Sequence, residues 1–265
     1  MAFPIDHDLH CHSQLSSCSN DPEQTVQALL DHAKKNGYTV QCVTDHFWDE
    51  DVPGPSNWYR PQGLAHVKRS LPLPKDDQVR MVFGCETEFC GGKKLGIDPA
   101  HYDDFDFIVI PPNHFHMEGF TRDASIQTEA QRADLLVERL EEISMLDLPW
   151  HKVGIAHLTC SLTHRGGDHA LLFSLVDEKR FRAVMHKFAT LGCGIELNSG
   201  CFDERFLSNP DSRLKLYRMA KEEGCKFYLA SDAHHLNWLD SVPKYCPNAV
   251  EMIGLTEKDL FRIPE

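Results

Sequence analysis

The 265-residue sequence lacks the signatures of several large protein classes. Its ten cysteines are scattered and form no CxxC pair, so neither zinc fingers nor a disulfide framework is expected. No apolar run is long enough to span a bilayer, and the N-terminal MAFPIDHDLH has neither the basic nor the apolar region of a signal peptide. These absences predict a cytoplasmic protein without a membrane partner.

Positive charge is also scarce. The chain has 27 Lys and Arg against 40 Asp and Glu, a formal net charge of −13, and no Lys/Arg cluster larger than about three residues. A nucleic-acid-binding surface needs a basic stripe, so no nucleic-acid partner is expected. The acidic balance together with 16 histidines suits a protein that holds several divalent cations, although acidity also serves solubility alone.

Short apolar runs alternate with amphipathic stretches along the whole sequence, which predicts an α/β fold. The expected strands are 5–9, 39–44, 81–85, 105–110, 153–157, 193–197 and 226–230. Most of these runs are continuously apolar, as in parallel strands that are covered on both faces. No repeat or composition shift divides the chain, so residues 1–265 are expected to form one domain.

Amphipathic helices are expected between these strands. The first would begin with Asp21 as its N-cap and Pro22 in its first turn, and would end at Gly37. The others are 124–146, 177–191, 210–223 and a short helix capped by Thr256. The proline-rich segment 47–79 interrupts this rhythm and is interpreted as a long loop or lid over one end of a barrel.

Nearly every expected strand is followed by a histidine or a carboxylate. These residues are His10 and His12, Asp45 and His46, Glu86, His114 and His116, His157, Glu196, and Asp232 and His234. In a parallel barrel, the C-terminal strand ends form the face where catalytic residues collect. A single pair such as His10 and His12 is equally well explained as ordinary polar residues, but the recurrence after seven strands favours a metal site.

The residue types restrict the choice of metal. Imidazole and carboxylate ligands suit Zn²⁺, Mn²⁺ or Fe²⁺ better than Mg²⁺ or Ca²⁺. The candidates are too many for one ion, so a cluster of two or three is expected, in which Glu86 could bridge two ions. Zinc lowers the pKa of a bound water to about 7, which gives a hydroxide nucleophile for phosphate or amide hydrolysis.

The segments DLHCHS, TDH, GCE, NHF, IAH and SDAH occur in an order that resembles the PHP (polymerase and histidinol phosphatase) superfamily. The likeness extends over nearly the whole chain. It implies a distorted, TIM-like (β/α)7 barrel in a single domain. It also implies a trinuclear centre of divalent metal ions, either Zn, Mn or Fe.

The resemblance implies a ligand set for each ion. The first set is His10, His12, Glu86 and Asp232, the second is Glu86, His114 and His157, and the third includes His46 and His234. The third set needs a further ligand soon after the first motif, where this chain departs from its relatives. Either Cys18 or Asp21, or neither, completes it, and Asp21 could instead be only a helix cap. His116 is the alternative to His114.

Other residues receive roles around the metals. Asp232 or a metal-linked histidine such as His234 would handle the proton, and Asp45 would orient an imidazole. Phosphate would be bound by Arg165 or Arg205, since a guanidinium group matches phosphate oxygens. Histidinol phosphatases have an arginine directly after the segment that IELNSG resembles, whereas here Arg205 follows five residues later.

The resemblance therefore implies a phosphoric monoester hydrolase that uses a metal-bound hydroxide on a small-molecule phosphate ester. Histidinol phosphate is the first candidate substrate. The alternatives are a PHP phosphodiesterase or exonuclease, a protein-tyrosine phosphatase of the same superfamily, and a non-catalytic metal-binding module. The sequence predicts no oligomeric state.

Overall fold

The computed structural model describes residues 1–19, 21–204 and 210–264. Its strands are β1 (His7–Asp8), β2 (Val40–Val43), β3 (His46–Phe47), β4 (Arg80–Thr87), β5 (Phe107–Ile110), β6 (Val153–Ile155), β7 (Gly194–Asn198) and β8 (Lys226–Ala230). They form one sheet in the order β1-β2-β4-β5-β6-β7-β8, with every pairing parallel. The short β3 pairs only with β4, beyond the end of β2.

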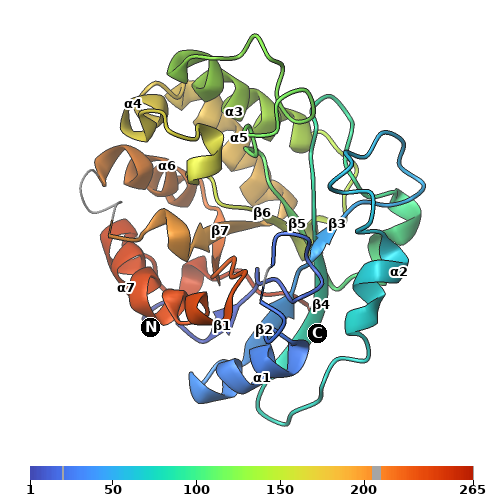
Figure 1. The fold of residues 1–265 in the computed structure, drawn as a ribbon. Helices are drawn as coiled ribbons and strands as arrows, with labels where there is room; N and C mark the ends of the chain where they lie inside the picture. The colour runs from blue at the N-terminus through green and yellow to red at the C-terminus, as the bar shows by residue number, and fades with distance from the viewer. Residues whose placement is uncertain (20, 205–209, 265) are drawn as a thin grey trace.

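The sheet closes on itself between its first and last strands. Leu9 N donates to Leu229 O at 3.0 Å, and Asp232 N donates to His10 O at 2.8 Å. Seven strand positions therefore surround a common interior, and the helices lie around the outside (Figure 1). The predicted single-domain, distorted (β/α)7 barrel is confirmed.

The helices are α1 (Val26–Lys35), α2 (Leu64–Val67), α3 (Glu129–Ile143), α4 (His169–Ser174), α5 (Glu178–Leu191), α6 (Asp211–Glu222) and α7 (Ser241–Ile253). Four of the five predicted helices occur, and the segment after Thr256 forms a 3₁₀ turn, Glu257–Asp259. The longest helix missed by the sequence interpretation is α7, which contains Pro247 in its interior. No helix in the described part of the chain is both long and apolar enough to cross a membrane.

The prediction that Asp21 caps the first helix is wrong. The N-cap is Thr25, whose side chain accepts a hydrogen bond from Ala28 N. Just before the helix, the carbonyl oxygen of Gln24 accepts from Gln14 N (2.9 Å) and so is used outside the helix. The buried Gln24 side chain donates from Nε2 to His12 O (2.6 Å) and Ala233 O (2.7 Å). Gln24 thus joins the segments that carry the first and last histidine motifs.

Alternating side chains divide the core into an inner and an outer layer. In β5, Phe107 and Val109 join the cluster inside the barrel, whereas Ile108 and Ile110 pack under the surrounding helices. Tyr228 on β8 belongs to the inner cluster and is fully buried.

Gly154 and Gly194 provide the space for the Tyr228 ring. A Cβ atom at Gly154 would lie 2.5 Å from the Tyr228 hydroxyl oxygen and 2.6 Å from Phe107 Cζ. We expect Gly154→Ala to lower the free energy of unfolding by about 1–3 kcal/mol, the usual cost of overpacking a core. A urea titration would measure this loss, and an unchanged transition midpoint would contradict the packing.

The 47–79 segment is more structured than a loop. It begins with β3, carries α2 and a 3₁₀ helix (Lys68–Ser70), and lies along the side of the barrel near β3 (Figure 1). Trp48 N donates to Gln62 O at 3.0 Å, and Tyr59 is fully buried. Its role as a lid stays a prediction.

Candidate metal centre

Glu86, near the end of β4, lies at the centre of the predicted histidine cluster and is 1% exposed. Its Oε2 atom lies 3.5 Å from His10 Nε2 and 3.4 Å from His12 Nε2. The same oxygen lies 2.8 Å from His46 Nδ1. Three residues from two different motifs therefore face one carboxylate oxygen.

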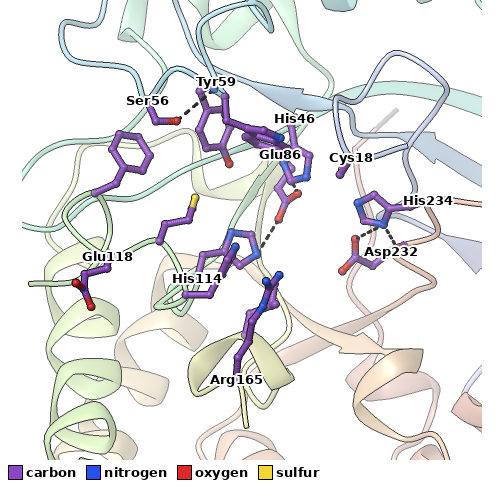
Figure 2. Close-up of a pocket in the computed structure, with 15 residues that line it drawn as sticks. Cys18, His46, Ser56, Tyr59, Glu86, His114, Glu118, Arg165, Asp232 and His234 are labelled. Carbon is purple, nitrogen blue, oxygen red and sulfur yellow. Dashed lines mark hydrogen bonds and ion pairs between the residues drawn. The ribbon is translucent and has the colours of Figure 1, made fainter. Parts of the chain in front are cut away.

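The other oxygen of Glu86 faces a different pair. Oε1 lies 3.5 Å from His157 Nε2 and 3.8 Å from His114 Nε2. A carboxylate whose two oxygens face separate ligand groups can bridge two metal ions. Figure 2 shows Glu86 between His46 and His114.

The candidate ligand atoms form three overlapping groups. In each group, the atoms lie no more than 4.8 Å from one another. The groups are His10, His12 and Glu86; Glu86, His114 and His157; and His12, His46 and His234. Asp232 joins the first group, since its Oδ1 is 3.1 Å from His12 Nε2 and 3.5 Å from His10 Nε2. The structure thus brings together the predicted ligand sets, and it places His12 in two of the groups.

Although histidine nitrogens lie close to them, several buried polar atoms in this cluster make no hydrogen bond with suitable geometry. Among these atoms are both oxygens of Glu86 and the Nε2 atom of His157, all of them buried. Each such atom costs about 1–3 kcal/mol if nothing else binds it. Coordination of a divalent cation by imidazole nitrogen and carboxylate oxygen would satisfy them, so the donor set fits a metal such as zinc.

A second layer of side chains fixes the orientation of the histidines. His10 Nδ1 lies 2.8 Å from Glu196 Oε2, and His114 Nδ1 lies 2.7 Å from Glu88 Oε2. His157 Nδ1 lies 3.1 Å from Asn113 Oδ1, and His12 Nδ1 lies 2.8 Å from Ser16 Oγ. Each contact uses Nδ1 and leaves Nε2 directed toward the centre, as is usual for metal ligands.

Sequence reasoning missed Glu88 and Ser16. The available signal for Glu88 was its position two residues after Glu86 in an extended segment, which puts both carboxylates on one face. Asp45 orients an imidazole indirectly, because it accepts from Ser16 Oγ (2.8 Å), which in turn contacts His12. It also accepts from the backbone and hydroxyl of Ser13.

Two residues of the site have unusual backbone conformations. Within the described ranges, His157 (φ 23°) and Asp232 (φ 51°) are the only non-glycine residues with positive φ. This conformation is uncommon for side-chain-bearing residues and often marks functional sites, where the surrounding structure maintains it. At Asp232, the bond from its N–H to His10 O ties the strained residue to the first motif.

The charges in the site compensate one another. Burial raises the pKa of the Glu86 carboxyl, but His46 and His10 outweigh it and hold that pKa well below its usual value. Burial together with His234 and His46 lowers the pKa of His12 well below its usual value. Glu86 is therefore an anion at neutral pH, and His12 is a neutral imidazole, the form that binds metals.

The alternatives left open by the sequence are separated by position. Cys18 lies against His46 and His234; burial raises the pKa of its thiol, but these histidines outweigh it and bring the pKa to about 7. Asp21 instead accepts from Leu236 N and Glu23 N, away from the histidine groups. Asp21 therefore binds backbone N–H groups, whereas the neighbours of Cys18 are two candidate metal ligands, His46 and His234.

His116 lines the pocket beside the cluster but belongs to none of the three groups. Burial and the neighbouring His114 lower its pKa to about 3. His235 is exposed.

The cluster opens into a pocket of about 620 Å³. One side is formed by ligand candidates, including His46, Asp232 and His234, and the pocket is further lined by Trp58, Tyr59, Met117, Phe120 and Leu162. Figure 2 shows Arg165 entering the pocket from the side opposite Tyr59. Arg205, the other predicted phosphate ligand, lies outside the described residues.

Comparisons with known proteins establish the fold. No protein-family model matches the chain, and no curated protein matches it in sequence. Among solved structures, the chain is similar to histidinol phosphate phosphatase from Lactococcus lactis subsp. lactis Il1403, in complex with zinc, L-histidinol and phosphate. The two are 16% identical over 95% of this chain and 94% of that one, with a TM-score of 0.57.

The chain is also similar to a proposed histidinol phosphatase from Listeria monocytogenes. The identity is 13%, over 88% of this chain and 96% of that one, with a TM-score of 0.58. Likeness at these identities concerns the fold, and it confirms at that level the resemblance drawn from the motifs.

Proposed function

We propose that the protein is a metal-dependent phosphatase that hydrolyses a small phosphate monoester, with histidinol phosphate as the first candidate substrate. The observation that carries this proposal is the set of three overlapping ligand groups around Glu86, at one side of a pocket that also contains Arg165. The Lactococcus protein, which shares the fold, was crystallised with zinc, L-histidinol and phosphate.

The proposed centre holds three divalent ions, Zn, Mn or Fe. Their ligands would be His10, His12, Glu86 and Asp232 for the first, Glu86, His114 and His157 for the second, and His46, His234 and Cys18 for the third. We omit Asp21 because its carboxylate is engaged by backbone N–H groups. When bound, such ions withdraw charge from phosphoryl oxygens and acidify water.

The protein's own residues would complete the reaction. Arg165 would bind phosphate oxygens, and the apolar side chains around Trp58 and Phe120 would contact the organic part of the substrate.

Asp232 is the most accessible carboxylate of the ligand groups, with its side chain 25% exposed, whereas that of Glu86 is 1% exposed. Burial raises the pKa of Asp232, but His10 and His12 outweigh burial and lower that pKa, so its carboxylate is an anion. We assign to Asp232, with His234 beside it, the transfer of the proton: the carboxylate would take it from the attacking water and deliver it to the leaving alkoxide.

The test combines metal content with substrate turnover. The purified protein, loaded with zinc or manganese, is given histidinol phosphate, other small monoesters, a phosphotyrosine peptide and bis(p-nitrophenyl) phosphate. Phosphate release from small monoesters, abolished by a chelator, is the expected result. Preference for the peptide or the diester would support the other enzyme alternatives, and a full metal load without turnover would indicate a non-catalytic module.

Arg165→Ala is expected to raise the KM for a phosphate monoester by about tenfold or more, because a charge-assisted hydrogen bond contributes about 1.5–3 kcal/mol. Metal content should not change. Arg262→Ala is the matched control, since this arginine is exposed and far along the chain in the C-terminal segment. Equal KM values for the two variants would remove Arg165 from the binding site.

A further inference from the structure

Two buried tyrosines contact the metal centre through carboxylates. The Tyr228 hydroxyl donates to Glu196 Oε2 at 3.0 Å, and the same oxygen lies 2.8 Å from His10 Nδ1. All three residues are fully buried. The phenol is thus joined to a candidate metal ligand by a single carboxylate oxygen.

The same arrangement occurs a second time, on other elements. The Tyr59 hydroxyl donates to Glu88 Oε2 at 2.9 Å, and this oxygen lies 2.7 Å from His114 Nδ1. Tyr59 comes from the 47–79 segment, whereas Tyr228 comes from β8. Two independent Tyr–Glu–His chains therefore end at histidines that belong to different ligand groups.

Packing alone does not require the hydroxyl of Tyr228. Phenylalanine would occupy nearly the same space as Tyr228 between Gly154 and Gly194, and would not bury a polar atom. Tyr38 provides the contrast, because it is also buried but its hydroxyl has no hydrogen-bond partner. A tyrosine can therefore be buried in this chain without a partner for its hydroxyl.

The hydrogen bond from the phenol acts on the carboxylate that holds the imidazole. It fixes the rotation of that carboxylate and reduces the negative charge available to the imidazole N–H. The histidine is then held as the Nδ1–H tautomer with Nε2 free for a metal ion, and its basicity is moderated.

We propose that Tyr228 and Tyr59 are positioning residues for two different metal ions, Tyr228 through Glu196 and His10, and Tyr59 through Glu88 and His114. This inference rests on the proposed metal centre. It also gives the 47–79 segment a defined role, because the placement of that segment determines the hydrogen bond to Glu88.

The test uses the full-length protein loaded with ¹¹³Cd, whose NMR resonances report each bound ion separately. Tyr228→Phe and Glu196→Gln are expected to shift the same resonance, because both act on His10. Tyr59→Phe and Glu88→Gln are expected to shift a second resonance, because both act on His114. Competition with a chelator should show each tyrosine variant losing about threefold to tenfold in affinity for one ion. Loss of a direct ligand partner typically costs more, about 10- to 100-fold.

Tyr38→Phe is the matched control and should leave every resonance in place. If Tyr59→Phe and Tyr228→Phe behave like this control, the inference is overturned, whatever the protein's phosphatase activity. Shifts of one and the same resonance would overturn the assignment to separate ions. A wild-type protein that binds no cadmium would overturn the metal centre itself, and one that binds cadmium normally but hydrolyses no ester would overturn only the proposed function.

Discussion

Glu86→Gln is expected to retain the fold and to reduce phosphatase turnover on the order of a thousandfold or more, with loss of at least one bound ion. The glutamine side chain fills the same volume, but it has one acceptor oxygen in place of two. Its NH₂ group would point toward either His10 and His12 or His114 and His157, depending on its orientation. A donor cannot coordinate a cation, and the negative charge of the bridge is also lost.

Metal content by mass spectrometry and phosphate release from the same samples would measure this effect. Glu222→Gln is the matched control, because it makes the same chemical change at an exposed carboxylate near the end of α6. A Glu86→Gln protein with a full set of ions and turnover within tenfold of the wild type would show that Glu86 does not bridge.

The ligand groups could be predicted because their signals are local in the sequence. His10 and His12 stand two residues apart at a strand end, and the carboxyl ends of all parallel strands meet on one face of a barrel. Once the strands are recognised, the meeting of their terminal histidines follows from the topology. The order of the motifs added the assignment of particular residues to particular ions, and this assignment stays a prediction.

The supporting hydrogen bonds could not be predicted in the same way. Tyr228 and Glu196 lie 32 residues apart, and they meet because β7 and β8 pair in a register that puts residue 196 beside residue 228. Periodicity predicts strands but not their register, so such contacts remain hidden until the sheet is known. The contact from Tyr59 to Glu88 depends on an irregular segment, for which no periodic signal exists.

Local rules also failed where a tertiary contact outweighed them. Asp21 and Pro22 have the residue types of a helix start, yet the helix begins only at Val26. Tertiary contacts use the groups of Gln24 instead: its carbonyl oxygen accepts from Gln14 N, and its side chain binds the backbone of the histidine motifs. In α7, by contrast, Pro247 does not prevent a helix, because the apolar face around Val242, Cys246 and Ala249 is buried against the core.

Asp232→Asn is expected to lower turnover of an alkyl phosphate by about 100- to 10,000-fold, the usual contribution of general acid–base catalysis. The substitution is well suited to the position, because asparagine tolerates the positive φ of residue 232 at least as well as aspartate. The fold should therefore persist, and the hydrogen bond from the backbone N–H to His10 O is unaffected by the change.

The identity of the leaving group separates the proton role of Asp232 from its proposed role as a ligand. An alkoxide must be protonated as it leaves, whereas p-nitrophenolate leaves readily without a proton. If Asp232 supplies that proton, the variant's deficit should be at least tenfold smaller for p-nitrophenyl phosphate than for histidinol phosphate, under metal saturation. An equal deficit with both substrates would instead assign Asp232 to metal binding alone. The proton would then belong to another group, for which the candidate is His234, with Nδ1 3.8 Å from Asp232 Oδ1 and its side chain open to the pocket.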